Sequence, residues 1–321
     1  MNANSNIEIS VVVPTFNEEG NVALLASELK TVLDQLQISA YEIIFIDDGS
    51  SDASLEVIKG LRATDRHIHY LQFSRNFGHQ HALKAGLDHA RGRAVISLDA
   101  DLQHPPALLS EMITLWRNGA QVVYTRRQDK QQIGLFKKWS AKLFYWIANK
   151  LSEVPIEEGT ADFRLLDRCV VDAIKGFKES HLFLRGLIPT LGFKQVGIDY
   201  QAASRHSGQT KYSFGKMFQF ALNGITSSSA KPLYFSIYLG LFFAFCAFIY
   251  GCYAIYVALF TNAAITGWAS LIASVLFIGG IQMILIGIVG IYLGKLFVQS
   301  KQRPTYIIES NSIQAIQHHE A

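Results

Sequence analysis

Short apolar runs and helical patterns alternate along the first two hundred residues of the chain. Five runs are predicted strands: Ile7–Val13, Tyr41–Ile46, 67–73, 93–99 and 121–125. Helical patterns at about 21–36, 53–63 and 79–90 separate the first four strands. Continuously apolar runs separated by helices are typical of a parallel sheet covered on both faces. The pattern therefore predicts an α/β fold with a doubly wound, mostly parallel sheet.

Polar clusters follow four of these strands at the point where each strand ends. They are PTFNE (14–18), DDGSSD (47–52), SRNFG (74–78) and DADLQ (99–103). Ligands of such sheets bind beyond the carboxyl ends of the strands, so we expect the four clusters to meet along one edge. After DADLQ, Pro105 restricts His104 to an extended conformation, and Pro105 or Pro106 suits the first turn of a helix.

A long stretch near the C-terminus carries no charge. From Pro232 to Gly294 there is no Asp, Glu, Lys, Arg or His, which is far longer than the ~20 apolar residues of one membrane span. We predict two transmembrane helices, at about 233–260 and 268–293, rather than a buried hairpin of a soluble core. The flanking basic residues are Lys211, Lys216, Lys231, Lys295, Lys301 and Arg303. The positive-inside rule then places residues 1–212 and the tail 299–321 in the cytoplasm.

Two further segments, 135–150 (LFKKWSAKLFYWIANK) and 213–231, combine lysines with aromatic residues. Each is either an ordinary amphipathic surface helix or a helix in the membrane interface, and the nearby spans favour the second. The polar N-terminus is unlike a signal peptide, and three cysteines suit a reducing compartment. The net charge of +3 is too small to indicate nucleic-acid binding but suits an anionic membrane surface.

The DADLQ cluster has the chemistry of a site for a hard cation. In an extended chain Asp99, Asp101 and Gln103 would point the same way, and together they offer only oxygen atoms. Oxygen ligands indicate Mg²⁺ or Mn²⁺ rather than zinc. Mg²⁺ is commonly held by one or two carboxylates together with substrate phosphates, so this incomplete set predicts a diphosphate ligand. The alternative for the cluster alone is an acidic loop that caps a helix.

The first two clusters suit a nucleoside. Asp47 and Asp48 end the second strand, where a carboxylate can accept hydrogen bonds from a base or ribose, and Phe16 can lie against a base. The alternative for these aspartates is turn and helix-capping chemistry, which we expect of Asp52. The chain has no P-loop motif, and no G-x-G-x-x-G follows the first strand. This argues against a P-loop NTPase and a standard dinucleotide-binding domain.

The segments VVVPTFNEEGNV, IDDGSSD, SRNFGHQHALKAG and LDADLQHPP resemble glycosyltransferase family 2, which has the GT-A fold, and within it the polyprenyl-phosphate glycosyltransferases. The motifs cover about Ile7 to Tyr212, and the two predicted spans resemble those of the bactoprenol type. The resemblance implies an inverting enzyme of the bacterial inner membrane that transfers glucose from UDP-glucose to undecaprenyl phosphate. Galactose, GlcNAc and an aminoarabinose derivative stay open as the sugar, because recognition of the base does not select the hexose. Self-association of the chain is also open.

The resemblance also implies roles for individual residues. The nucleotide sugar would be bound by Pro14, Phe16, Glu18, Asp48, Asn76, Gly78, Lys84, Asp99, Ala100 and Lys211. The metal, Mg²⁺ or Mn²⁺, would be held by Asp99 and Asp101, with Gln103 assisting. Arg205 and Lys211 belong to RHSGQTKY, which is similar to the family's R-x-x-G-x-S-K-Y with Thr210 for Ser, and would clamp phosphates. Without the resemblance, that segment is equally a basic juxtamembrane loop.

The candidate catalytic residues are Asp162, Asp101 and Arg205. An alcohol acceptor needs a general base, but a lipid monophosphate, with a second pKa of about 6, is already largely ionised near neutral pH. Asp162, in GTADFR, would therefore act as a base or orient the acceptor and Arg164, and the structural alternative is a capping or salt-bridged carboxylate. The candidates for holding the acceptor phosphate are Arg126, Arg127 and Arg164; the first two are otherwise solvated surface residues.

Two other functions fit parts of the sequence. A processive polysaccharide synthase needs many spans and usually a Q-x-x-R-W motif, which the chain lacks. A non-catalytic carrier or flippase subunit for a lipid-linked sugar would not need a complete set of metal- and phosphate-binding residues. The transferase is therefore the prediction.

Overall fold

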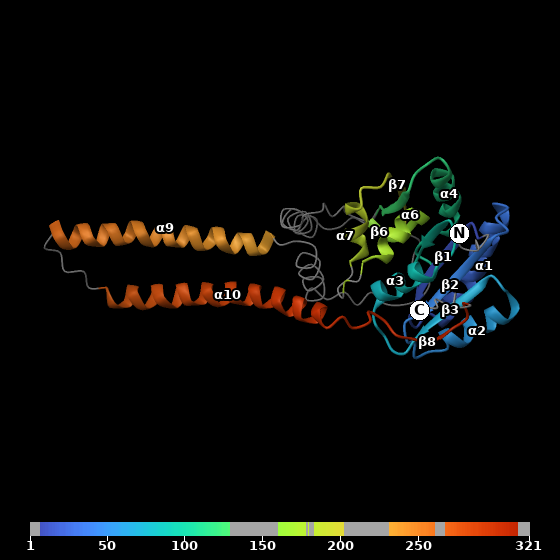
Figure 1. Cartoon of the computed structure of the whole chain (residues 1–321), viewed down its shortest axis with the longest axis horizontal. Coiled ribbons are helices and arrows are strands. Elements are labelled where there is room, and N and C mark those ends of the chain that lie inside the picture. The colour runs from blue at the N-terminus through green and yellow to red at the C-terminus, as the bar shows by residue number, and fades with distance from the viewer. Residues whose placement is uncertain are drawn as a thin grey trace, which may run out of the picture. The chain divides into compact units, whose positions relative to one another are not determined.

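The computed structural model describes residues 7–128, 160–177, 179, 183–201, 231–260 and 267–313. The described residues fall into two compact units (Figure 1). The first combines the residues up to 128, those from 160 to 201 and the tail from Arg303 onward. The second contains the helices α9 (Lys231–Phe260) and α10 (Trp268–Ser300). The tail, which the sequence analysis treats as a separate segment, thus belongs with the first unit.

An eight-stranded sheet, counted over the described residues, forms the centre of the first unit in the order β7-β5-β6-β4-β1-β2-β3-β8. Its strands are β1 (Ile9–Thr15), β2 (Tyr41–Asp47), β3 (Ile68–Phe73), β4 (Ala94–Ser97), β5 (Val122–Arg127), β6 (Thr160–Asp167), β7 (Gln195–Tyr200) and β8 (Ile308–Asn311). The neighbours among β1 to β4 pair in parallel, as does β5 with β7. β6 and β8 run antiparallel to their neighbours, so the sheet is mixed.

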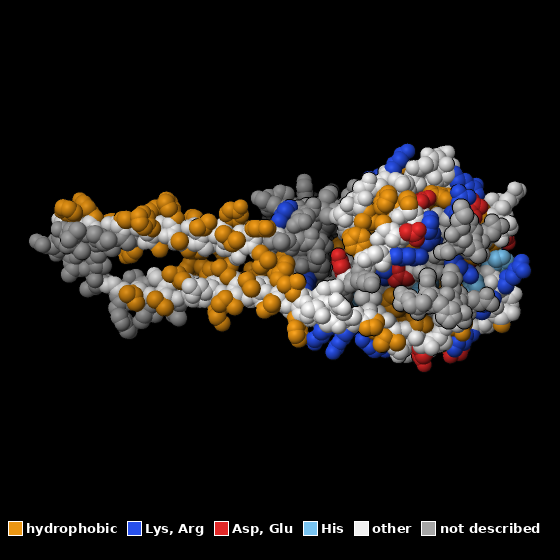
Figure 2. Space-filling model, in the orientation of Figure 1, with side chains coloured by type: hydrophobic (Ala, Val, Ile, Leu, Met, Phe, Trp, Pro, Cys, Tyr) orange, Lys and Arg blue, Asp and Glu red, His pale blue; other side chains and the backbone are white. Residues whose placement is uncertain are grey.

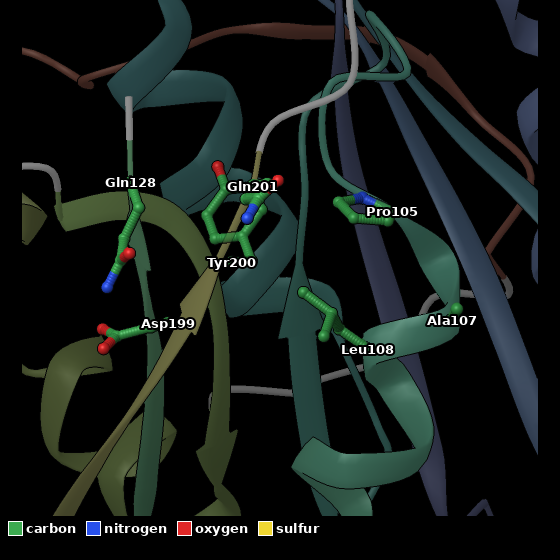
Figure 3. Close-up of a pocket in the computed structure, with 7 residues that line it drawn as sticks. All are labelled: Pro105, Ala107, Leu108, Gln128, Asp199, Tyr200 and Gln201. Atoms are coloured by element: carbon green, nitrogen blue, oxygen red, sulfur yellow. The ribbon is translucent and has the colours of Figure 1, made fainter. Parts of the chain in front are cut away.

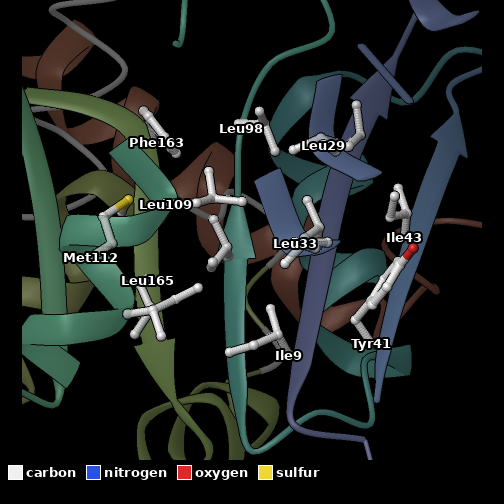
Figure 4. Close-up of a cluster of buried hydrophobic side chains, with 14 of the residues drawn as sticks. Ile9, Leu29, Leu33, Tyr41, Ile43, Leu98, Leu109, Met112, Phe163 and Leu165 are labelled. Carbon is white, nitrogen blue, oxygen red and sulfur yellow. The ribbon is translucent and has the colours of Figure 1, made fainter. Parts of the chain in front are cut away.

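Helices cover both faces of this sheet. They are α1 (Glu19–Gln35), α2 (Ser54–Thr64), α3 (His79–His89), the short 3₁₀ helix η1 (Pro106–Leu108), α4 (Leu109–Arg117), α6 (Arg168–Lys175) and α7 (Leu184–Thr190). Successive strand residues face opposite sides: Ile43 packs into one core cluster and Ile44 into the other. Figure 4 shows the first cluster, in which Leu29 and Leu33 of α1 meet Ile9 and Ile43. This two-sided burial explains why the strands are continuously apolar.

The second unit is a pair of long apolar helices. α9 and α10 lie side by side, and the rings of Phe243 and Phe277 pack edge to face with centroids 5.8 Å apart (Figure 1). Figure 2 shows hydrophobic side chains exposed along both helices. Among the described residues, one segment, Phe277–Ser300, is long and apolar enough to cross a membrane, and the apolar segment Ser236–Tyr250 in α9 is shorter. The two predicted spans therefore coincide with two helices, of which one has the length and composition of a span.

Helix α3 approaches the sheet most closely at Gly86, which is buried against β1 and β2. A Cβ atom at this position would lie 2.9 Å from Ile46 Cδ1 and closer still to Val12 Cγ1. Gly60, in the exposed part of α2, would meet no atom within 4 Å. The packing of α3 therefore requires a glycine at position 86, and the packing of α2 does not require one at position 60.

We expect Gly86→Ala to lower the free energy of unfolding by about 1–3 kcal/mol, because Val12 and Ile46 would have to shift in a packed core. Gly60→Ala is the matched control and should raise the free energy of unfolding by up to about 1 kcal/mol, because alanine favours the helix. Chemical denaturation of the full chain in detergent measures both. Equal effects of the two substitutions would contradict the close packing of α3.

Candidate functional site

The carboxyl ends of β1, β2, β3 and β4 carry four loops. They are loop 1 (16–18), loop 2 (48–53), loop 3 (74–78) and loop 4 (98–105). Neighbouring parallel strands place these loops at one edge of the sheet, and hydrogen bonds join loop 1 to loop 2 and loop 2 to loop 3. The helix that begins after loop 3 is joined to loop 4. The prediction that the four polar clusters meet along one edge is therefore confirmed.

Loops 1 and 2 cap each other's helices. The backbone N–H groups of Glu18 and Glu19, at the start of α1, donate to Ser54 Oγ (2.8 Å) and Asp52 Oδ2 (3.2 Å). In return, the Glu19 carboxylate accepts a hydrogen bond from the N–H of Ala53 at the start of α2 (2.9 Å). The N–H groups at a helix start need such acceptors. The expected capping role of Asp52 is confirmed, and it serves both helices.

Asp48 joins loop 2 to loop 3. Its carboxylate accepts hydrogen bonds from the N–H groups of Phe77 (2.7 Å) and Gly78 (2.9 Å) at the start of α3. Burial raises the pKa of the Asp48 carboxyl, although these two N–H groups act in the opposite direction. Gly49, with φ 69°, lets the loops meet, since a Cβ atom there would lie 2.6 Å from the carbonyl carbon of Arg75. Asp48 thus caps a helix, and its contact with a nucleotide stays a prediction.

His79, the first residue of α3, bridges two carboxylates. Its Nε2 lies 2.7 Å from Asp99 Oδ1, and its Nδ1 lies 3.9 Å from Asp162 Oδ2. Burial alone would lower the pKa of His79, but the hydrogen bond to Asp99 and the nearby charges raise it overall. Burial would likewise raise the pKa of Asp99, but the hydrogen bond from His79 holds it at about 2. The raised pKa favours the protonated form of His79, whose charge offsets part of the negative charge at this edge of the sheet.

His104 supports Asp99 through the backbone. Its Nδ1 accepts a hydrogen bond from the Asp99 N–H (3.1 Å), and its ring stacks on Phe163 with centroids 5.2 Å apart. Burial lowers the pKa of His104, which agrees with a neutral ring whose Nδ1 is an acceptor. The prolines act as predicted, because Pro106 is the first residue of η1.

Asp101 and Gln103 form a pair within loop 4. Gln103 Nε2 donates to Asp101 Oδ2 (2.8 Å), and Arg127 at the end of β5 donates to Gln103 Oε1 (3.0 Å). The expectation that these side chains align because the chain is extended is wrong. β4 ends at Ser97, and Leu102 has a left-handed backbone with φ 60°. The reversal at Leu102 is what brings the Gln103 amide back onto the Asp101 carboxylate.

The oxygen donors of loop 4 fit a divalent cation by their chemistry. Asp99 and Asp101 contribute carboxylates and Gln103 an amide oxygen, and hard cations prefer oxygen ligands. In the described part of the chain, no group of three or more His, Cys, Asp and Glu side chains forms a ready metal cluster. A cation bound here would therefore complete its shell with water or substrate oxygens, as Mg²⁺ commonly does. It would also compete with His79 for Asp99.

Asp162 on β6 is buried and bonded through both carboxylate oxygens. Arg185 on α7 donates from Nε to Oδ1 (3.2 Å) and from an Nη atom to Oδ2 (2.7 Å). Gln80 of α3 donates to Oδ2 (3.3 Å). Burial would raise the pKa of Asp162, but the charge and hydrogen bonds of Arg185 lower it overall. A general base works best with a pKa near the operating pH, so these contacts favour an orienting or ion-paired Asp162 over a base.

Four residues of this arrangement were not predicted as site residues: His79, Gln80, His104 and Arg185. His79 and Gln80 directly follow Gly78 in SRNFGHQHALKAG, and His104 lies between DADLQ and the prolines, so their positions carried a signal. Arg185 carries none, because it lies in an apolar segment and does not follow a predicted strand.

The other predicted nucleotide-sugar residues described next lie in β1 or in loops 1, 3 and 4. Pro14 is buried in β1, Phe16 in loop 1 is 45% exposed, and Ala100 is buried in loop 4. The Asn76 carbonyl accepts a hydrogen bond from its neighbour Arg75 (2.9 Å), and Glu18 accepts one from Asn21 (2.5 Å).

Three predicted cations have partners other than these carboxylates. The Lys84 ammonium pairs with Asp88, one turn further along α3. Arg126 pairs with Asp199 (2.7 Å), and the buried Arg164 donates to the Ala161 carbonyl (3.2 Å). Arg205, Lys211 and the segments 135–150 and 213–231 lie outside the described residues.

A pocket of 390 Å³ opens beside loop 4, beyond the ends of β5 and β7 (Figure 3). It is lined by Pro105, Ala107, Leu108, Gln128, Asp199, Tyr200 and Gln201. The Tyr200 ring also contacts the ring of His104 edge to face, with centroids 6.0 Å apart. The pocket therefore adjoins the loop that carries Asp99 and Asp101.

We expect Arg185→Ala to lower the free energy of unfolding by about 1–3 kcal/mol, because it leaves the buried Asp162 carboxylate without its charged hydrogen-bond donor. In an Asp162→Asn background the same substitution should cost less, with a coupling of about 1–3 kcal/mol. Denaturation of the four proteins in detergent measures this cycle without any substrate. Additive effects would contradict the ion pair.

A family model and three relatives agree with the residue pattern. The description "Glycosyl transferase family 2" belongs to the family model that matches residues 10–175. An uncharacterised glycosyltransferase, YkcC, of Bacillus subtilis (strain 168) is 40% identical over 306 residues, covering 95% of this chain and 94% of the relative. A prophage bactoprenol glucosyl transferase homologue of Escherichia coli (strain K12) is 43% identical over 305 residues, covering 94% and 99%. The bactoprenol glucosyl transferase of Shigella phage SfV is 42% identical over 306 residues, covering 95% and 99%.

Solved structures are more distant. The mannosyltransferase PcManGT from Pyrobaculum calidifontis, in complex with GDP-Man and Mn²⁺, has 16% identity and a TM-score of 0.46, with 90% of this chain and 88% of that chain covered. That likeness is too low to carry an argument. The family match across the strand-end loops and the relatives at 40–43% identity over nearly the whole chain show that this protein belongs to glycosyltransferase family 2.

Proposed function

We propose that this protein is a membrane-bound, inverting glycosyltransferase that moves glucose from UDP-glucose to undecaprenyl phosphate at the bacterial inner membrane. The observation that carries the proposal is the edge where the strand-end loops meet: it presents Asp99 and Asp101 beside His79 and the Asp162–Arg185 pair. The same chain contains a helix with the length of a membrane span. The names of the Escherichia coli and phage relatives, which include "bactoprenol glucosyl transferase", support glucose as the sugar and a bactoprenol lipid as the acceptor.

The donor would lie along loops 1 to 4. Exposed Phe16 offers a ring for the base, and the positive end of the α3 helix dipole lies at Gly78, which favours anions. Asp99 and Asp101, with Gln103, would hold the divalent cation. When bound, that cation would neutralise charge on the departing diphosphate. Arg205 and Lys211 are proposed to contact the phosphates from outside the described residues.

The acceptor would enter from the side of β5 and β7. The pocket at Tyr200 lies next to loop 4, and Arg126 and Arg127 end the strand beside it. A phosphate oxygen of the lipid attacks the anomeric carbon from the face opposite the diphosphate. The bond from that carbon to the diphosphate oxygen breaks, giving an inverted polyprenyl-phosphate sugar and UDP.

This reaction needs no strong base, because the lipid phosphate, with a second pKa of about 6, is already largely ionised at neutral pH. The lowered pKa of Asp162 suits that requirement. Arg185 and Gln80 hold both carboxylate oxygens of Asp162. Asp162 would therefore place a fixed negative charge beside the reacting centre. Its neighbours would help to orient the acceptor.

The membrane part is proposed to be a two-helix hairpin formed by α9 and α10, with the catalytic domain and both termini in the cytoplasm. α9 is 30 residues long and α10 33, so each exceeds the ~20 residues of a span. An enzyme whose acceptor lipid stays in the bilayer needs such an anchor to meet it at the surface.

Sugar transfer to undecaprenyl phosphate tests the chemistry. With radiolabelled nucleotide sugars, detergent and Mn²⁺, the wild-type chain should transfer glucose from UDP-glucose, and EDTA should abolish the transfer. Asp101→Asn should lower the rate about 100-fold or more, because it removes a charge that holds the metal near the diphosphate. Asp172→Asn makes the same chemical change on the exposed face of α6 and should leave the rate unchanged.

The outcomes separate the alternatives. Transfer from a different nucleotide sugar would replace glucose and keep the enzyme. Binding of UDP with no transfer from any donor would contradict the transferase and support a non-catalytic carrier of lipid-linked sugar.

Thiol labelling tests the hairpin. In a variant with Cys169, Cys246 and Cys252 replaced, a single cysteine from Asn262→Cys should react with a membrane-impermeant maleimide in spheroplasts. A single cysteine from Lys301→Cys should react only after lysis. Labelling of both sites in intact spheroplasts, or of neither, would contradict the proposed topology.

A further inference from the structure

The C-terminal tail is an integral part of the catalytic unit. Its strand β8 pairs antiparallel with the edge strand β3, with Gln72 opposite Ser310 and Leu71 opposite Asn311. Two residues beyond β8, Ile313 is buried in the core cluster that also contains Phe73. In Figure 1 this red segment lies beside β3. The tail thus covers a sheet edge that would otherwise expose unpaired backbone groups.

Tyr306, just before β8, also contacts helix α3. Covering the edge of the sheet does not require this contact. Its ring stacks on Phe73 with centroids 5.2 Å apart, and its hydroxyl donates to Asp88 Oδ2 (3.1 Å). The other Asp88 oxygen accepts from Lys84, so a tail residue completes a network on α3. Burial and the Asp88 charge both raise the pKa of the Tyr306 hydroxyl, which therefore stays protonated and remains a donor.

Helix α3 links this network to the catalytic carboxylates. Asp88 is in its last turn, and His79 and Gln80, in its first turn, contact Asp99 and Asp162. Asp88 lies nine positions after His79 along the helix, a distance of ~14 Å at 1.5 Å per residue. Because Gly86 packs directly on the sheet, α3 has little room to bend between these points. The contact at Asp88 therefore adds to the packing that fixes the direction of α3 and, with it, the place of the first turn.

We propose that the tail is a positioning element of the active site, in which Tyr306 holds the Lys84–Asp88 pair and so fixes α3 with His79 and Gln80 against Asp99 and Asp162. Tyr306 is a positioning residue in this account and touches no substrate. In this proposal Lys84 helps to hold helix α3. The sequence had predicted instead that Lys84 contacts the nucleotide sugar. The kinetic readout below rests on the proposed function, and the exchange readout does not.

The test compares two tail substitutions in the full chain. Tyr306→Phe keeps the ring on Phe73 and removes the hydroxyl that reaches α3. Ser310→Ala is the matched control, because it removes a hydroxyl that donates to Gln72 Oε1 on β3 (2.7 Å). Each variant loses one side-chain hydrogen bond of the tail, and only the first loses a contact with α3.

Hydrogen exchange followed by mass spectrometry measures the order of α3 directly. In Tyr306→Phe, amides in peptides covering residues 79–86 should exchange about tenfold faster, as expected for the loss of a hydrogen bond to a charged group. The kcat for sugar transfer should fall by about tenfold, while KM for the nucleotide sugar changes less than about twofold, because positioning acts on the reacting geometry. Ser310→Ala should change neither quantity by more than about twofold.

Unchanged exchange in α3 and an unchanged kcat in Tyr306→Phe would overturn the proposal. Equal effects of Tyr306→Phe and Ser310→Ala would also overturn it, because the tail would then act only as edge cover. If the wild-type chain transfers none of the sugars tested, the proposed function fails, and the exchange of the two variants still decides the role of the tail.

Discussion

The site depends on one constraint of parallel strands: the carboxyl ends of β1 to β4 and the starts of the helices that follow must share one edge. A helix start carries N–H groups that need acceptors. In this chain the acceptors come largely from the neighbouring loop, with Asp52 serving α1 as well as α2 and Asp48 serving α3. Capping therefore fixes the loops relative to one another, and the polar residues at the edge become a rigid frame.

The carboxylates at this edge are compensated inside the protein. Asp99 has His79, and Asp162 has Arg185 and Gln80. Asp162 is buried, and a buried charge persists only when it is paired and hydrogen-bonded, whereas the Asp99 side chain is 36% exposed and is partly compensated by solvent. The arrangement also sets the chemistry. Asp162 stays ionised and fixed, whereas the Asp99–His79 pair is the contact that a cation would have to replace. The site thus combines the Asp162–Arg185 ion pair, held through both carboxylate oxygens, with the Asp99–His79 contact, which a cation would replace.

The local pattern of apolar and polar residues was enough to predict the first five strands of the sheet. β1 to β5 were located to within two residues at each end, because strands buried on both faces are continuously apolar and their ends are marked by polar clusters. β6 and β7 were missed. The β-prone segment RPTYII (303–308) ends at Ile308, where β8 begins, so the pattern carried only part of the information on the return of the chain to β3. Leu102 was beyond prediction, because a left-handed leucine is held by its surroundings rather than by its own preference. Arg185 was missed because its role depends on its contact with Asp162, which lies on another element of the fold.

The central claim is that the edge formed by loops 1 to 4 binds a nucleotide diphosphate together with a divalent cation. Titration of the full chain in detergent with Mn²⁺, followed by electron paramagnetic resonance with and without UDP, tests it directly. The account predicts weak binding of Mn²⁺ alone, because loop 4 supplies an incomplete shell, and clearly tighter binding when UDP adds its phosphate oxygens. The gain should disappear in Asp99→Asn. Mn²⁺ binding that is indifferent to UDP, or unchanged in Asp99→Asn, would contradict the assignment of this edge as the donor site.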